Sequence, residues 1–161
     1  MPTSDEQTQQ HRWWLLRHAP RHDTGVLYHP DAVGEVWVQA IADVVPFLVS
    51  TGDFAPADMQ YRMHRQHLWN AQTGLYGERF NVDEGTWVRE APTAHGNAGV
   101  AAGMAEALRM GGDGTPPEMR ARWGRETRAL IDAMAMLEID GEAASLLELA
   151  VRLGKEEAWL L

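Results

Sequence analysis

The chain has 161 residues, of which 14 are Lys or Arg and 23 are Asp or Glu, giving a formal net charge of −9. This length predicts one domain with its own hydrophobic core. The acidic balance argues against a sequence-independent nucleic-acid partner, because such binders present a basic face to the phosphates. No apolar run approaches the roughly 20 residues of a membrane helix. The polar, acidic start is unlike a signal or transit peptide. We therefore expect a cytoplasmic protein with neither nucleic acid nor membrane as a partner.

Cysteine is absent from the chain. This excludes a thiolate nucleophile, a disulfide framework, an iron–sulfur cluster and a Cys-based zinc site. His18 and His22 have the spacing of two metal ligands on one helical face. Pro20 lies between them, however, and disfavours that helix. The sequence therefore predicts no metal site in this chain.

The amino-terminal third predicts a tail, an arm and one helix. Residues 1–10 are expected to be a disordered tail, and 11–161 a single helical domain that opens with an extended arm or a short strand over 13–16. Residues 31–51 predict a helix, because apolar side chains recur on one face; these are Trp37, Ile41, Val44, Val45 and Leu48. Pro46 should kink this helix, and Gly52 should end it.

The rest of the chain also predicts mainly helices. Asp58 is expected to cap a helix that runs to about residue 70. Glycines divide residues 71–98 into loops with room for one short strand or hairpin. A small-residue helix is expected over 100–110. A capping box formed by Thr115 and Glu118 should open a longer helix, and a last helix should span 142–153. The predicted class is mainly α, with a Gly-rich irregular middle segment.

Two arginines in the helix after Asp58 form the first candidate site. Arg62 and Arg65 are one helical turn apart, so one face can present two guanidinium groups. Such a face would recognise a carboxylate, a phosphate or an oxidised sulfur. The alternative is a solvated charged face that pairs with Asp58.

A second candidate site combines Arg17 and His18 with residues far downstream. Leu16-Arg17-His18-Ala19 follows an apolar run, Glu84-Gly85 comes later, and His95 precedes a glycine. This pattern resembles the histidine phosphatase family. The resemblance implies His18 as the nucleophile in phosphoryl transfer, with Arg17, Glu84 and His95 around it. The family's Ser-Pro-Leu-x-Arg segment is absent.

Residues 22–67 and 119–153 carry another resemblance. In the first stretch, the pattern is a His-Asp-x-Gly element, a Trp, a helix-ending Gly, an aromatic residue and an acidic residue; these are His22, Asp23, Gly25, Trp37, Gly52, Phe54 and Asp58. The second stretch contains Trp123, Leu130-Ile131 and Glu148-Leu149 in that order. Both resemble the helical region of the nitrile hydratase β subunit and, equally, of the thiocyanate hydrolase β subunit. Gln60 stands where the family has an Arg, which leaves Arg62 or Arg65 as the substitute.

The nitrile hydratase resemblance implies a lyase subunit that binds no cofactor itself and wraps a metal-bearing α-type chain. Cobalt or iron would lie in that partner, and Arg62 or Arg65 would donate hydrogen bonds to its oxidised cysteines. Residues of the interface or substrate channel would be Trp13, Trp14, Tyr28, Trp37 and Trp69. Because no strand-rich tail follows, the resemblance also implies a separate barrel subunit. The substrate would be a small nitrile-like molecule.

Three hypotheses therefore stay open at the level of sequence. The chain is a non-catalytic subunit of a nitrile hydratase-like enzyme, a phosphatase that uses His18 and His95, or a helical assembly protein without enzymatic activity. Each makes a different structural demand. The phosphatase, in particular, needs both histidines at one anion pocket on the rim of a central parallel sheet.

Overall fold

The computed structural model describes residues 1–160 and is mainly α, which confirms the predicted fold class. The helices are α1 (Ser4–Arg17), α2 (Gln39–Ser50), α3 (Phe54–Leu68), α4 (Ala94–Gly111), α5 (Pro117–Met134) and α6 (Gly141–Glu156), with a short 3₁₀ turn at Gly112–Gly114. The strands are β1 (Glu35–Trp37), β2 (Trp69–Asn70), β3 (Leu75–Tyr76), β4 (Arg79–Asn81) and β5 (Thr86–Arg89).

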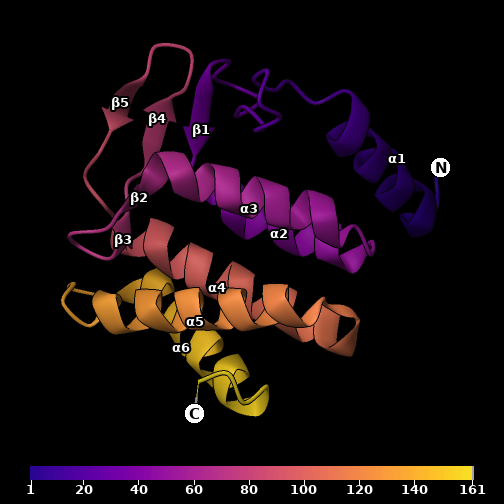
Figure 1. The fold of residues 1–161 in the computed structure, drawn as a ribbon. Coiled ribbons are helices and arrows are strands. Elements are labelled where there is room, and N and C mark those ends of the chain that lie inside the picture. The colour runs from indigo at the N-terminus through magenta and orange to yellow at the C-terminus, as the bar shows by residue number, and fades with distance from the viewer. Residues whose placement is uncertain (161) are drawn as a thin grey trace.

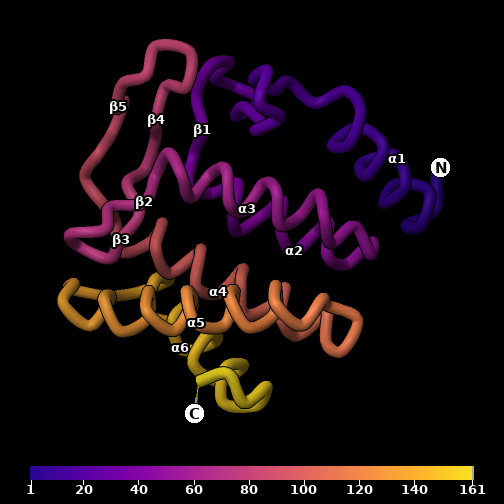
Figure 2. Tube along the Cα trace, in the orientation of Figure 1, coloured from indigo at the N-terminus to yellow at the C-terminus, as the bar shows by residue number. Residues whose placement is uncertain are grey.

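The helices form two layers, which Figures 1 and 2 show from one side. In the inner layer, α4 packs between α2 and α6. In the outer layer, α3 packs on α2 and α5 packs on α4. Each outer helix is thus joined by a short connection to an inner helix, so that the chain advances by successive helical hairpins.

Small residues on α4 allow α2 to approach it closely. A Cβ atom added to Gly103 would lie 2.6 Å from the Cα atom of Ala42. Val38 lies beside Gly96 at one end of this contact, and Val49 lies beside Gly111 at the other. Because the residue numbers of α2 and α4 both increase from the first of these contacts to the second, the two helices run parallel.

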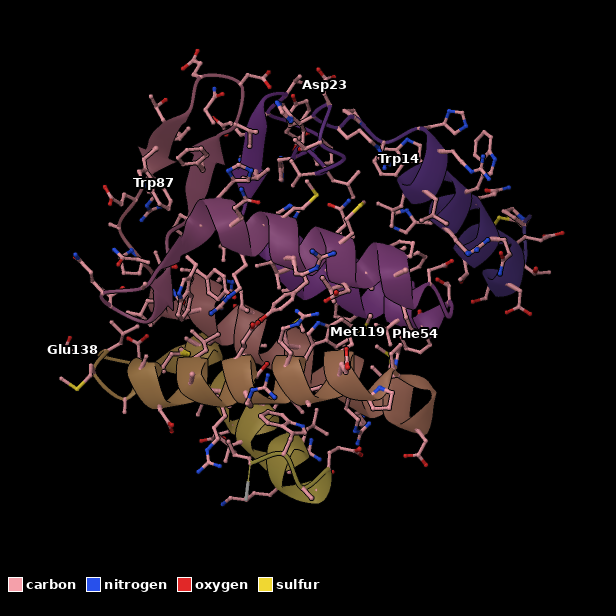
Figure 3. The ribbon with its side chains drawn as sticks, in the orientation of Figure 1. Trp14, Asp23, Phe54, Trp87, Met119 and Glu138 are labelled. Atoms are coloured by element: carbon pink, nitrogen blue, oxygen red, sulfur yellow. The ribbon has the colours of Figure 1, made fainter. Side chains whose placement is uncertain are left out.

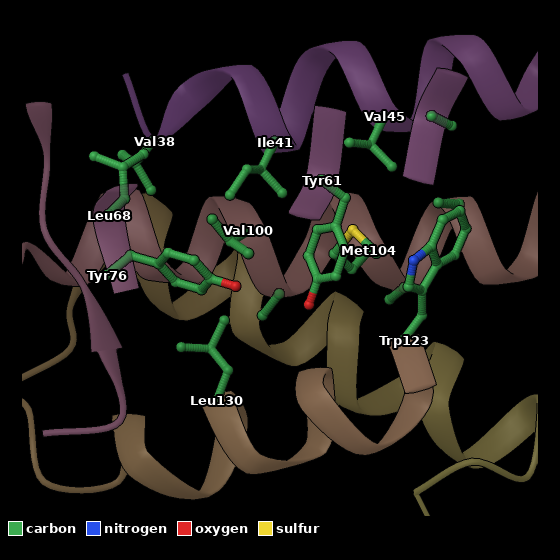
Figure 4. Packing of buried hydrophobic residues seen from close by; sticks show 14 of the residues in the cluster. Val38, Ile41, Val45, Tyr61, Leu68, Tyr76, Val100, Met104, Trp123 and Leu130 are labelled. Carbon is green, nitrogen blue, oxygen red and sulfur yellow. The ribbon is translucent and has the colours of Figure 1, made fainter. Parts of the chain in front are cut away.

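Apolar side chains from both layers fill the space between them, as Figure 4 shows. The fully buried members include Ile41 and Val45 on α2, Met104 on α4, and Trp123 and Leu130 on α5. The stripe predicted within residues 31–51 therefore faces this core from Ile41 onward.

Short antiparallel strands lie at the end of the molecule where α2 and α4 begin (Figure 1). One sheet has the order β1-β4-β5, with Val36 opposite Phe80 and Phe80 opposite Trp87. The pair β2-β3 forms a second, two-stranded sheet. The hairpin expected within residues 71–98 is confirmed, since β4 and β5 are consecutive and paired. The same segment also contains β3.

The first 17 residues differ from the sequence expectation. The tail expected over residues 1–10 and the extended arm or strand over 13–16 are replaced by α1. A capping box begins this helix: the Thr3 hydroxyl accepts from the Glu6 amide at 3.2 Å, and the Glu6 carboxylate accepts from the Thr3 amide at 2.6 Å. Arg12 then ties α1 to Asp53 through two hydrogen bonds of 2.6 and 2.7 Å. The capping signal was present but lacked the apolar periodicity that would have marked a helix.

Three predicted boundaries are also wrong. The helix expected from residue 31 begins at Gln39, because residues 35–37 pair with β4 instead. Asp58 is not a cap but lies in the second turn of α3. The Thr115 hydroxyl is buried without a hydrogen-bond partner among the described residues, so no capping box forms there. Gly52, by contrast, has a φ of +79° directly after α2, as the prediction requires. Among residues 1–160, no helix has the length and apolar character needed to cross a membrane.

Candidate functional site

Two adjoining cavities open on the inner helical layer and form the candidate site, which we call the inner groove. The first has a volume of about 430 Å³ and lies across α2, α4 and α6. The second has a volume of about 250 Å³ and lies between α1, the segment 27–30 and α2. Gln39 and Asp43 line both cavities. The first cavity falls in the size range of small-molecule sites, which are usually concave and mostly apolar.

The beginnings of all three inner helices contribute to the first cavity. Gln39 begins α2, His95 is the second residue of α4, and Glu142 is the second residue of α6. The floor between them is made of small side chains, including Gly99 and Gly103. The glycines that let α2 and α4 pack closely thus also leave room above the helices.

Asp43 is the carboxylate at the junction of the two cavities. Its position four residues after Gln39 places both side chains on the same face of α2, away from the buried Ile41 and Val45. Asp43 is exposed at the cavity mouth, and partial desolvation by the surrounding wall raises the pKa of its carboxyl from the ordinary value. No hydrogen bond or ion pair engages its carboxylate within the described part of the chain. A carboxyl group in this setting can hold a proton and give it to a bound molecule.

Two further carboxylates line the first cavity, and they differ in how they are held. Glu106 accepts hydrogen bonds of 2.7 and 2.9 Å from Arg109, one turn later on α4. Glu142 lies 4.0 Å from the Nδ1 atom of His95, and its side chain is 78% exposed. Glu142 is therefore the more available of the two for a ligand.

Aromatic side chains line the second cavity. Trp14 comes from α1, as Figure 3 shows, and Tyr28 and His29 come from the segment before β1. The His29 ring stacks on Trp37 with a centroid distance of 3.4 Å. The Tyr28 hydroxyl donates to Asp83, and this hydrogen bond raises the Tyr28 pKa to about 12. Tyr28 is thus positioned as a neutral hydrogen-bonding group.

Arg62 and Arg65 lie away from the inner groove, in the polar contact between α3 and α5. We call this contact the outer seam; it consists of Asp58, Tyr61, Arg62, Arg65, Arg122, Trp123 and Glu126. Asp58 accepts from Arg62 at 3.0 Å, from Arg122 at 2.6 Å and from the Trp123 indole at 2.9 Å. Figure 3 shows side chains meeting across the gap between the two ribbons.

Arg65 is held more tightly than Arg62. Its guanidinium group lies 3.8 Å from the centre of the Trp69 ring and donates to the Tyr76 hydroxyl at 2.7 Å. Because the Arg62 and Arg65 side chains are engaged within the chain, the prediction that they contact a partner's oxidised cysteines has no structural basis. The alternative interpretation was a charged face that pairs with Asp58. Arg62 does pair with Asp58.

The residues of the phosphatase hypothesis do not assemble. The sheets are small and antiparallel, so the central parallel sheet that this hypothesis requires is absent from residues 1–160. His18 stacks against Trp13 with a centroid distance of 3.9 Å, whereas His95 lies beside Glu142. Glu84 is exposed in the turn between β4 and β5, and Arg17 is exposed at the end of α1. This hypothesis is wrong.

The tryptophans predicted to line an interface lie in different settings. Trp13 is 59% exposed, Trp14 is half-buried in the second cavity, and Trp37 packs under His29 and Arg79. The Trp69 ring faces the Arg65 guanidinium and meets the Tyr76 ring edge-to-face. Among residues 1–160, no group of three or more His, Asp or Glu side chains could hold a metal ion.

The solved structures to which the chain is similar include family 105 glycoside hydrolases. The chain is similar to a family 105 glycoside hydrolase from C. acetobutylicum, with a TM-score of 0.78, 11% identity, and coverage of 98% of this chain and 54% of that chain. A possible member of the same family from Klebsiella pneumoniae has a TM-score of 0.78 and 16% identity, with coverage of 95% of this chain and 47% of that chain. One from Salmonella enterica has a TM-score of 0.69 and 16% identity, with coverage of 93% of this chain and 52% of that chain. No protein-family model and no curated protein matches the sequence.

These comparisons concern the fold alone, a series of helical hairpins of the α-toroid kind. The chain spans about half the length of the structures it matches. Within this chain α2, α4 and α6 form the inner layer, and the inner groove lies on that layer.

The nitrile hydratase resemblance is therefore wrong. The chain shares its fold with single-chain glycoside hydrolases and not with a metal-free β subunit. Four predictions depended on this resemblance and are not supported: the lyase activity, the nitrile-like substrate, the cobalt- or iron-bearing partner and the separate barrel subunit. The motif consisted of single residues at helical spacings, and helices of many folds provide such spacings.

Sequence reasoning missed Asp43 and Gln39. The available signal was the polar face of α2, where these residues lie four positions apart and opposite the apolar stripe. The apolar stripe of the same helix forms the core, and the Arg and His residues of other segments give the stronger motif signals.

Proposed function

We propose that this chain contributes to a carbohydrate-active hydrolase that cleaves glycosidic bonds in the inner groove. The observation that carries the proposal is Asp43, a carboxyl group of raised pKa at the junction of two cavities, in a fold shared with glycoside hydrolases. A saccharide bound across this junction would place a glycosidic oxygen within reach of Asp43.

The chemistry of glycoside cleavage requires an acid to protonate the leaving oxygen. Asp43 is suited to this role because the protonated form persists to a higher pH than in a solvated carboxyl group. A second carboxylate must activate water or attack the sugar. Glu142 is the candidate for this role, since it lines the same cavity and Glu106 is already bound to Arg109.

The test is hydrolysis of a panel of oligosaccharides, measured by the release of reducing ends. Asp43→Asn keeps the shape but removes the acid, and it should lower kcat about 100-fold or more with little change in KM. Asp113→Asn, on an exposed turn away from the groove, is the matched control and should retain full activity. Unchanged activity in Asp43→Asn would refute the role of Asp43.

A second function, saccharide binding without hydrolysis, is favoured by the 78% exposure of the Glu142 side chain. A solvated carboxylate of this kind lacks the desolvated setting typical of catalytic groups. Calorimetric titration with the same oligosaccharides separates the two functions. Binding that persists in Asp43→Asn, with no reducing ends released by the parent chain, would identify the binding role.

A further inference from the structure

The second cavity lies between α1 and α2 and so determines how α1 is attached to the fold. The two helices contribute His11, Trp14 and Leu15 from α1, and Ala40 and Val44 from α2. The three α1 residues follow one another at helical spacings of three and one, so their side chains lie on one side of the helix. That side of α1 covers a cavity of about 250 Å³.

Burial anchors only the carboxyl end of α1. Leu15 is the one buried residue over Ser4–Arg17. The guanidinium group of Arg21 donates to the Leu15 carbonyl oxygen, and Arg21 also forms an isolated bridge with Leu27. Residues 4–10, in contrast, are exposed apart from the half-buried Thr8. The helix is therefore fixed at residues 15–21 and extends from there along the cavity.

A polar contact holds the middle of α1, and we call it the latch. It consists of Arg12 and Asp53, which are joined by hydrogen bonds of 2.6 and 2.7 Å. The Thr51 hydroxyl donates to the same carboxylate at 2.6 Å, and the His11 ring meets the Phe47 ring edge-on beside it. The Arg12 side chain is 38% exposed. Ion pairs with an exposed member are screened by salt and contribute little to stability, so the latch can open without unfolding the core.

We infer that α1 is a lid on the second cavity, which pivots about residues 15–21 when the latch between Arg12 and Asp53 opens. Local opening of this kind occurs where few apolar contacts have to break. An open lid exposes the cavity from the side of α1, opposite the wall formed by α2. Asp43 lines this cavity, so the lid controls one of the two approaches to that carboxyl group. The inference concerns access to the cavity and is independent of the proposed hydrolysis.

The first test measures access to the cavity with an introduced thiol, which is the only one present because the chain has no cysteine. Ala40→Cys places a thiol beneath α1, and Ala129→Cys places one on the exposed face of α5. The thiol reagent DTNB should react about 10-fold more slowly with the first than with the second. Adding Arg12→Ala should raise the rate at Ala40→Cys about 5-fold. Arg17→Ala, at an exposed position of the same helix, removes the same charge and should leave that rate unchanged.

The second test is hydrogen exchange followed by mass spectrometry, and it needs no introduced thiol. In Arg12→Ala the amides of α1 should lose protection, while those of α2–α6 keep the protection they have in the parent chain. Arg17→Ala should match the parent throughout. The lid is overturned if the Ala40→Cys thiol reacts as fast as the Ala129→Cys thiol, or if Arg12→Ala changes neither the rate nor the exchange of α1. Loss of protection in α2–α6 as well would overturn it too, because the latch would then support the whole fold.

Discussion

The outer seam and the inner groove both contain charged side chains between helices. They differ in whether those charges are paired within the chain. In the outer seam, Asp58 accepts from Arg62, Arg122 and Trp123, so its charge is neutralised and hydrogen-bonded within the chain. In the inner groove, Asp43 lies at a cavity with no such partner among the described residues. The first arrangement stabilises the packing of α3 against α5. The second leaves a carboxylate free to meet a ligand, and this difference is why the functional proposal rests on Asp43.

The outer seam should show the largest effect on stability. Asp58→Ala removes the acceptor for Arg122 and the Trp123 indole, and it leaves the fully buried indole N–H and the partly buried guanidinium group without that partner. We expect a loss of about 3–5 kcal/mol in the free energy of unfolding, measured by urea denaturation. Arg62→Ala is the control: its side chain is 60% exposed, so the loss should stay below about 1 kcal/mol. Equal effects of the two substitutions would contradict the central role of Asp58.

The second prediction concerns the pH dependence of stability. His64 lies on α3 with its Nδ1 atom 2.8 Å from the Gln60 carbonyl oxygen, and its Nε2 atom has no partner among residues 1–160. Burial lowers the His64 pKa to about 4. Because the unfolded chain takes up the proton near pH 6.5, stability is complete above that pH and falls as the pH drops toward 4. The expected loss is about 3 kcal/mol over this interval.

A matched pair of variants isolates the contribution of His64. His64→Leu should flatten the slope of unfolding free energy between pH 6.5 and 4, whereas His18→Leu, at an exposed position, should leave it unchanged. Burial and the charge of His22 also lower the pKa of His67, so His67 contributes to the pH dependence in the same direction. A slope that persists in His64→Leu would assign the effect to His67 instead.

The contrast between seam and groove also explains what the sequence could predict. Helical periodicity predicted most of α2, because its apolar face packs on the core, whereas turn and capping signals indicated α3, α5 and α6. The partners of Asp58 could not be predicted, since Arg122 and Trp123 lie more than 60 residues away and only the tertiary fold brings them together. Trp37 fitted the apolar stripe of the next helix, yet pairing with β4 places it in a strand. The inner groove depends on three separate helices, so no local motif contains it.

The smallest predicted effect concerns the floor of the inner groove, and it separates two glycines on the same helix. A Cβ atom on Gly103 would lie 2.6 Å from the Cα atom and 3.0 Å from the carbonyl oxygen of Ala42, and backbone atoms cannot move aside without shifting α2. Gly103→Ala should therefore lower the free energy of unfolding by about 1–3 kcal/mol. A Cβ atom on Gly99 would lie 3.8 Å from the Ala42 methyl group, an ordinary contact.

Gly99→Ala should instead raise stability by up to about 1 kcal/mol, because alanine is the better helix former. Both positions line the first cavity. Thermal unfolding monitored by circular dichroism measures the difference between the two variants. Close packing of α2 on α4 predicts changes of opposite sign in the free energy of unfolding for the two substitutions. Two stabilising substitutions would mean that α2 and α4 lie farther apart, and the groove between their faces would then be wider than described.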